Sequence, residues 1–218
     1  MRWWIVLVLV ATALPAPGET GAPPTHTVGA PLKTVRPARG RFLVATRSMV
    51  DPEFAECVAL LLDADDDGAT AVVINRPSDV KLSTLLPAVE GLRERSDVAF
   101  LGGPVLPTHL VVLMRGKPVG GTAERLFADV HVLTARQAIR DALAAGLPRQ
   151  RLRAYVGHAG WAPGQLDAEI EDGDWMVIAA DPGLVFADHA ETVWSQLIER
   201  SEGSWTRTNR LPRVASAP

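Results

Sequence analysis

The chain has 218 residues, of which 47% are hydrophobic and 22% charged, a composition that predicts a globular protein of one or two domains and excludes a disordered one. Its single cysteine excludes an intrachain disulfide. The formal net charge of −3 hides an acidic body, because residues 42–199 hold 13 basic and 23 acidic side chains. A body of that sign repels a phosphate backbone, so we expect no nucleic-acid binding by the domain itself.

Residues 1–16 have the layout of a secretory signal peptide, with one arginine, an apolar run from Trp3 to about Leu14, and small residues near its end. The run is shorter than the roughly 20 residues that a spanning helix needs, so no stable membrane span is expected. We expect a periplasmic or secreted protein if the signal is cleaved, and a cytoplasmic one if it is not. Residues 17–39 are rich in Pro, Gly, Ala and Thr and predict a flexible linker.

One domain is predicted over residues 40–201, and residues 202–218 are predicted to form a disordered tail. Apolar runs bounded by turn residues predict strands over 41–46, 57–62, 69–75, 98–103, 109–114, 130–134, 152–157 and 174–180. Periodicity and end signals predict helices over 134–148, 163–173 and 188–200. The first and third begin with candidate capping boxes, Thr134 with Gln137 and Asp188 with Glu191. Because the strands outnumber the helices and do not alternate with them, the predicted fold class is α+β, a single compact domain with a mixed sheet.

Motifs of known chemistry are missing from the sequence. The acidic turn at 63–68 has part of a calcium-loop spacing, but Ile74 stands where that loop needs a glutamate, so a hairpin turn is predicted. The five histidines show no metal-ligand spacing, and no nucleophile or phosphate-loop motif occurs. Cys57 lies in an apolar run and is expected to be buried. We therefore predict no catalytic residues, no metal and no cofactor.

Three loops that follow predicted strands carry residues suited to ligand binding, namely I-N-R-P-S at 74–78, L-G-G-P-V at 101–105 and A-G-W-A-P-G-Q-L at 159–166. Glycine and proline allow tight turns and a close approach of two backbones. The donors of these loops are able to converge on a small anionic or polar ligand. The candidate ligand-binding residues are Asn75, Arg76, Gly102, Gly103, Gly160, Trp161 and Gln165.

The same loops also carry a family resemblance. The chain contains, in order, M-x-D-P-x-F from Met49, N-R-P from Asn75, G-G-P-V from Gly102 and A-G-W-x-x-G-Q-L-x-x-E-I from Ala159. Over about 160 residues it resembles the YqgE/AlgH family of bacterial proteins. The resemblance implies a bifurcated, partly barrel-like β-sheet surrounded by helices. It supplies no catalytic residues, and the family label suggests regulation of transcription.

Three hypotheses for function follow. The leading one is a non-enzymatic ligand-sensing or regulatory domain, whose partner is a small ligand or another protein. The first alternative is a hydrolase-like enzyme in which His158 acts with Asp167 or Glu169 in acid–base catalysis. The second alternative is a transcriptional regulator, as the family label suggests, and the acidic body argues against it.

Overall fold

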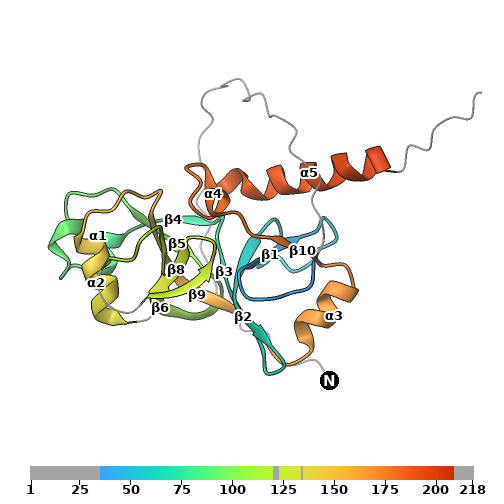
Figure 1. Ribbon diagram of the computed structural model, residues 1–218, viewed down its shortest axis with the longest axis horizontal. Coiled ribbons are helices and arrows are strands. Elements are labelled where there is room, and N and C mark those ends of the chain that lie inside the picture. Colours follow the sequence, from blue (N-terminus) through green and yellow to red (C-terminus); the bar gives the residue numbers. More distant parts are fainter. Residues whose placement is uncertain (1–34, 120–122, 134, 209–218) are drawn as a thin grey trace, which may run out of the picture.

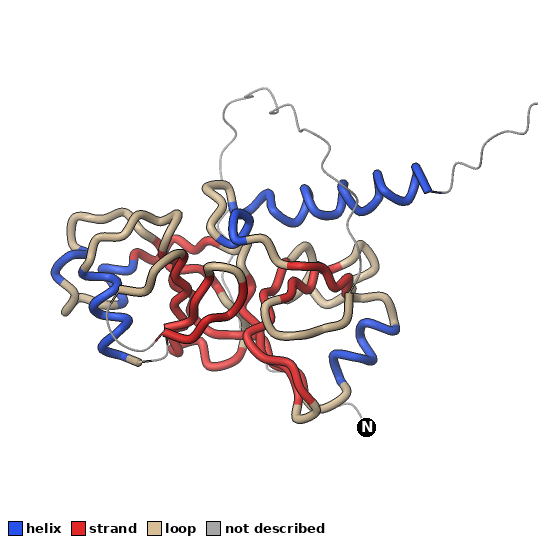
Figure 2. Tube along the Cα trace, viewed as in Figure 1, coloured by secondary structure: helices blue, strands red, loops and turns tan. Residues whose placement is uncertain are grey.

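The computed structural model describes residues 35–119, 123–133 and 135–208. The predicted signal peptide, residues 17–34 of the predicted linker, Thr134 and residues 209–218 of the predicted tail lie outside the described residues. The described chain folds into strands that curl around one another, with helices on several sides (Figures 1 and 2).

The strands are β1 (Arg41–Ala45), β2 (Val58–Asp65), β3 (Gly68–Val73), β4 (Pro77–Lys81), β5 (Val98–Leu101), β6 (Val105–Arg115), β7 (Ala123–Phe127), β8 (Val130–Leu133), β9 (Leu152–Trp161) and β10 (Trp175–Ala179). The helices are α1 (Leu82–Leu85), α2 (Arg136–Ala144), α3 (Gln165–Glu171), α4 (Pro182–Val185) and α5 (Val193–Thr208), with 3-10 turns η1 (Glu90–Leu92) and η2 (Ala190–Thr192).

Strand β9 is the point where the sheet divides. It pairs antiparallel with β3 and β6 and parallel with β5. From β3 the sheet continues through β2 and β1 to β10, from β6 it continues through β8 to β7, and β5 pairs onward only with β4. The parallel pair makes the sheet mixed and the division makes it bifurcated, which confirms the predicted α+β fold class.

The branch formed by β1, β2, β3 and β10 is buried on both faces. Phe42 and Val44 of β1 join a core cluster with residues of α4 and α5, whereas Leu43 and Ala45 join a second cluster with α3. Alternate residues of a strand point to opposite faces. Burial of both faces explains why these strands are continuous apolar runs in the sequence.

The other end of the molecule has its own core. Residues of β6, β8 and β9 pack against α2 and η1 in a third cluster that includes Met114, Leu133 and Leu143. In Figure 1, α1 and α2 lie at the opposite end of the molecule from α3, while α4 and α5 lie along one side. Helices therefore surround the sheet, as the resemblance implied. Within the described residues, no helix is both long and apolar enough to cross a membrane.

All eight predicted strands and all three predicted helices are present, but two strands were missed. Strand β4, P-S-D-V-K, is polar and largely exposed, and β7, A-E-R-L-F, has two exposed charged residues among its apolar ones, so neither has the apolar run that identified the others. Residues 202–208, predicted as the beginning of a disordered tail, are helical because α5 continues to Thr208. Cys57 is fully buried as expected, and burial raises the pKa of its thiol to about 12.

The predicted capping boxes do not describe the observed helix starts. Helix α2 has Ala135 as its N-cap, without a side-chain hydrogen bond. Asp188 instead accepts hydrogen bonds from the side chains of Arg149 and Gln150, and these bonds occupy the carboxylate that the box would have used. Helix α5 is thus reached through the short turn η2.

A close contact between two backbones fixes where β9 bends. Gly157 has φ +72°, and a Cβ atom added to it would lie 2.2 Å from the carbonyl oxygen of Gly103. A Cβ on Gly103, whose φ is +148°, would lie 2.3 Å from the carbonyl carbon of His158. These distances are too short for any side chain, so only glycine allows the loop after β5 to lie on β9 at this point.

Gly157 and Gly164 form a matched pair for testing this contact, because Gly164 has φ +74° with nothing within 4 Å of an added Cβ. We expect Gly164→Ala to cost about 1–2 kcal/mol of unfolding free energy from the left-handed backbone alone. Gly157→Ala should cost a further amount of about 1–3 kcal/mol, because backbone atoms must move apart. Urea unfolding of both variants measures the difference, and equal losses would show that the contact is not tight.

Candidate ligand-binding site

Asn75 and Arg76 attach the loop before β2 to the end of β3. The Asn75 side chain is 6% exposed; it accepts a hydrogen bond from the backbone N–H of Val58 (2.8 Å) and donates one to the carbonyl oxygen of Glu56 (2.9 Å). Arg76 donates to the backbone carbonyls of Glu53 and Ala55. Both side chains therefore have a structural role in the described chain.

The predicted glycines fall into two groups. Gly102 and Gly103 form the close contact with β9, and Gly102 links two strands by donating to Val156 and accepting from Val73 through its backbone. Gly160 lies within β9 opposite Thr70 of β3. The strand thus continues past Gly157, where the sequence predicted its end, and the turn to α3 begins only after Trp161.

Trp161 and Gln165 hold α3 against the sheet through Glu169. The indole N–H groups of Trp161 and Trp175 each donate to Glu169 Oε2 at 2.8 Å, and Gln165 Nε2 donates to Oε1 at 2.9 Å. The two indoles also pack with Phe54, with ring centroids 5.7–6.1 Å apart. Side chains of the A-G-W-x-x-G-Q-L-x-x-E-I motif therefore join β9, α3 and β10 through hydrogen bonds to Glu169.

The structure brings the predicted residues together only in part. Asn75 and Arg76 lie beside the Gly102 loop, because the Leu101 N–H donates to the Arg76 carbonyl. Trp161 and Gln165 lie elsewhere, at α3, where both bond to Glu169. None of the seven predicted residues lines the cavities of about 690, 450 and 210 Å³ that the described residues form. Ligand binding at these loops stays a prediction.

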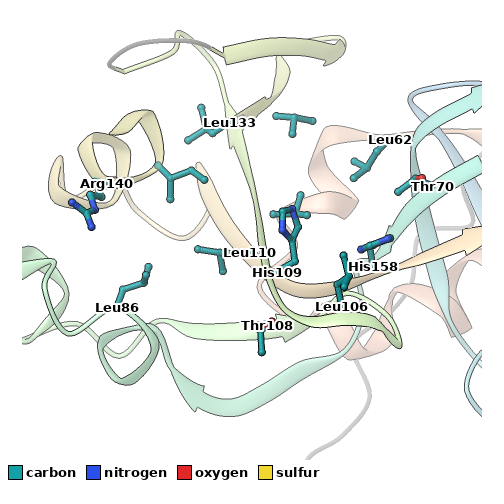
Figure 3. A pocket seen from close by; sticks show the side chains of 13 residues that line it. Leu62, Thr70, Leu86, Leu106, Thr108, His109, Leu110, Leu133, Arg140 and His158 are labelled. Carbon is teal, nitrogen blue, oxygen red and sulfur yellow. The ribbon is translucent and has the colours of Figure 1, made fainter. Parts of the chain in front are cut away.

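The cavity of about 690 Å³ is lined by residues of β2, β3, β6, β8, β9 and α2 and by Leu86 (Figure 3). Most of its lining is aliphatic, which suits the body of a small organic molecule. Its polar side chains are two histidines, two threonines and one arginine, and no carboxylate occurs among the lining residues that the structure describes. The lining residues are Leu62, Thr70, Leu86, Leu106, Thr108, His109, Leu110, Val111, Val132, Leu133, Ile139, Arg140 and His158.

A bulge in β6 brings His109 to His158. Val105 pairs with His158 and Leu110 pairs with Val156, so four residues of β6 bulge out opposite one residue of β9. The two imidazole rings lie 6.4 Å apart, centre to centre, at 77°. Burial and, to a smaller degree, the neighbouring His109 lower the pKa of His158. The His158 ring is therefore neutral near pH 7 and is both a donor and an acceptor.

The bulge also forms an apolar rim. Leu106 has φ +47°, a left-handed backbone conformation that is strained for a leucine. Its side chain is 60% exposed although it lines the cavity. Non-glycine residues in such sparsely populated backbone conformations cluster at functional sites.

The carboxylates proposed as partners of His158 lie elsewhere. Asp167 lines the cavity of about 450 Å³, which His158 does not, and Glu169 already accepts three hydrogen bonds from side chains. The structure describes no hydrogen bond or ion pair between His158 and either residue. Among the described residues no group of three or more His, Cys, Asp or Glu side chains is arranged to hold a metal ion.

The cavity of about 210 Å³ contains a buried arginine with a structural role. Arg153 is 5% exposed; it donates to the carbonyls of Val185 and Ala187 at 2.8 Å, and lies 4.4 Å above the Phe100 ring. Burial lowers the pKa of its guanidinium. These hydrogen bonds satisfy backbone carbonyls at the C-terminal end of α4 and hold the helix on the sheet.

Residues 42–206 of the chain match the AlgH-like family. The chain belongs to the AlgH-like family. A UPF0301 protein of Streptomyces avermitilis is 38% identical over 185 residues, which cover 82% of this chain and 91% of that protein. A UPF0301 protein of Xylella fastidiosa is 37% identical over 166 residues, which cover 73% of this chain and 87% of that protein.

Two solved structures share the fold. The crystal structure of protein DIP2367 from Corynebacterium diphtheriae matches with a TM-score of 0.66 and 28% identity, over 78% of this chain and 90% of that one. The solution structure of AlgH from Pseudomonas aeruginosa matches with a TM-score of 0.64 and 26% identity, over 83% and 98%. The family and the fold expected from the loop motifs are thus confirmed.

Sequence reasoning missed His109, Arg140 and the aliphatic lining of the cavity. Neither residue belongs to a motif: His109 begins a predicted strand, and Arg140 lies within the predicted helix over 134–148, where the structure leaves it exposed. The one signal of a bulge was the turn-rich sequence G-G-P-V-L-P-T-H at 102–109, whose last five residues belong to the long strand β6. No local pattern predicts which residue of β9 the bulge faces.

The pKa of His158 tests the geometry of the imidazole pair. Replacement His109→Gln removes the neighbouring imidazole and should raise the pKa of His158, while leaving it below its ordinary value because burial is the larger cause. Observation of the imidazole signals by NMR across a pH titration measures this. An unchanged midpoint would mean that the two rings do not interact.

Proposed function

We propose that this AlgH-like protein is a non-enzymatic ligand-sensing or regulatory domain that binds a small organic molecule in the cavity of about 690 Å³ lined by His109, His158 and Arg140. The single observation that carries the proposal is the composition of that lining. Aliphatic side chains from β2, α2, β6 and β8 face one space in which a few polar groups lie at defined places. Cavities of this volume and composition suit drug-sized ligands.

Three further features support binding rather than catalysis. Among the described residues that line the cavity there is no carboxylate to act with the histidines. Glu169 already accepts three hydrogen bonds and Asp167 lines another cavity, and the Leu106 rim gives the ligand an apolar entrance. Burial of each methylene of a ligand contributes about 0.8 kcal/mol. An aliphatic cavity of this kind therefore supplies affinity, and its histidines and arginine supply selectivity.

Filling the cavity should abolish binding. Ile139→Trp and Leu62→Trp place an indole in the cavity from α2 and from β2, since both residues line it. We expect each variant to bind the neutral probe 1-decanol at least about tenfold more weakly than the unaltered protein, because the indole occupies the space of several methylenes. Changes in amide NMR shifts during titration measure the affinity and show which residues respond.

Val50→Trp is the matched control, because Val50 is 90% exposed and lies outside the cavity. It should bind 1-decanol like the unaltered protein. Thermal unfolding of all three variants checks that they fold. If 1-decanol causes no saturable shifts at the cavity, or if the two filled variants bind it unchanged, the proposed site is wrong.

We further propose that the domain works outside the cytoplasm, in the periplasm or secreted, on the strength of the signal-like residues 1–16. The intact mass of the protein recovered from its own cells tests this. A mass lacking about the first 16 residues is expected, and a full-length mass in the soluble cytoplasmic fraction would contradict export.

A further inference from the structure

The geometry points to a specific ligand class, a medium-length aliphatic carboxylate whose carboxylate binds Arg140 and whose far end carries a hydroxyl or carbonyl oxygen that bonds to His109 and His158. This inference rests on the proposed function, because it names the ligand of the same cavity. It follows from how the polar side chains are distributed along the lining.

Apart from Thr108, which lies below Leu110 in Figure 3, the polar side chains of the cavity lie toward two ends. Figure 3 shows Arg140 on α2 at one end and His158 beside Thr70 at the other, with His109 next to His158. Between them lie aliphatic side chains, among them Leu86 and Leu110. A ligand that satisfies this lining needs a polar group at each end and an unbranched apolar body between them.

The charge at the Arg140 end selects an anion. Arg140 makes no hydrogen bond or ion pair with the side chains that the structure describes, and none of the described lining residues is acidic. The neighbouring carboxylate of Asp141 accepts a hydrogen bond from Gln137. A guanidinium at the mouth of an aliphatic cavity favours a carboxylate, to which it donates two charge-assisted hydrogen bonds.

The imidazole end selects a neutral oxygen. Burial and the neighbouring His109 lower the pKa of His158, so at pH 7 its ring carries no charge to attract a second anion. A neutral imidazole donates to a carbonyl and accepts from a hydroxyl. The hydroxyls of Thr70 and Thr108 line the same cavity and are able to bond with such a group.

Three ten-carbon probes separate the contributions of the carboxylate and of the terminal hydroxyl to the affinity. They are 1-decanol, decanoate and 10-hydroxydecanoate, each titrated by calorimetry below its aggregation threshold. We expect decanoate to bind about tenfold more tightly than 1-decanol, as one charge-assisted contact provides. 10-Hydroxydecanoate should bind several-fold more tightly than decanoate, as one further hydrogen bond provides.

Variants assign each preference to its residue. Arg140→Met should abolish the preference for decanoate over 1-decanol and leave the affinity for 1-decanol unchanged, whereas the control Arg93→Met, at an exposed arginine outside the cavity, should change nothing. His158→Leu should abolish the preference for 10-hydroxydecanoate over decanoate without weakening the binding of decanoate. His109→Gln, which keeps a polar side chain, serves as a second variant if His158→Leu does not fold.

The outcomes separate the inferred ligand class from the proposed function, which is binding of a small molecule in this cavity. Equal affinity for 1-decanol and decanoate, or a preference for decanoate that survives Arg140→Met, overturns the ligand class while cavity binding stands. Failure of 1-decanol to bind in the cavity overturns the proposed function itself.

Discussion

The close approach of Gly103 to Gly157 is the constraint on which the rest of the structure depends. At that contact a Cβ on Gly157 would lie 2.2 Å from a carbonyl oxygen, so the loop after β5 reaches β9 only because both positions lack side chains. On one side of the contact β9 pairs with β5, and on the other side it pairs with β3. The bifurcation of the sheet thus occurs where the two backbones meet.

The same contact creates the cavity. Once the loop lies on β9, Val105 is held opposite His158 and the next four residues of β6 bulge outward before pairing resumes at Leu110. The bulge carries His109 to His158 and leaves Leu106 exposed at the rim. Backbone geometry, packing and the chemistry of the lining are therefore linked, and a ligand in this space would contact the point where the branches of the sheet meet.

The sequence predicted the strands that are buried on both faces of the sheet. Strands such as β1 and β2 are continuous apolar runs because alternate residues enter different cores, and such runs are visible without a structure. Strands β4 and β7 were not predicted, because exposed polar residues interrupt any apolar run in them. Residues 202–208 lack a strong helical pattern but continue α5.

The candidate site was less predictable, for a physical reason. Loop motifs that look suited to ligands, such as Asn75-Arg76 and Trp161 with Gln165, bond to the chain itself in the described structure. The cavity instead combines unremarkable residues of five strands, of α2 and of the C-cap of α1. His109 and His158 are far apart in sequence and meet only through the register of β6 on β9, which no local pattern encodes.

The most direct test of these conclusions is a crystal structure of the protein with 10-hydroxydecanoate. We predict density for the ligand in the cavity between α2 and the β6 bulge, with the carboxylate at Arg140 and the hydroxyl within hydrogen-bond distance of His158. Density at the loops of Asn75 and Gln165 instead, or none in the cavity at saturating ligand, would contradict them.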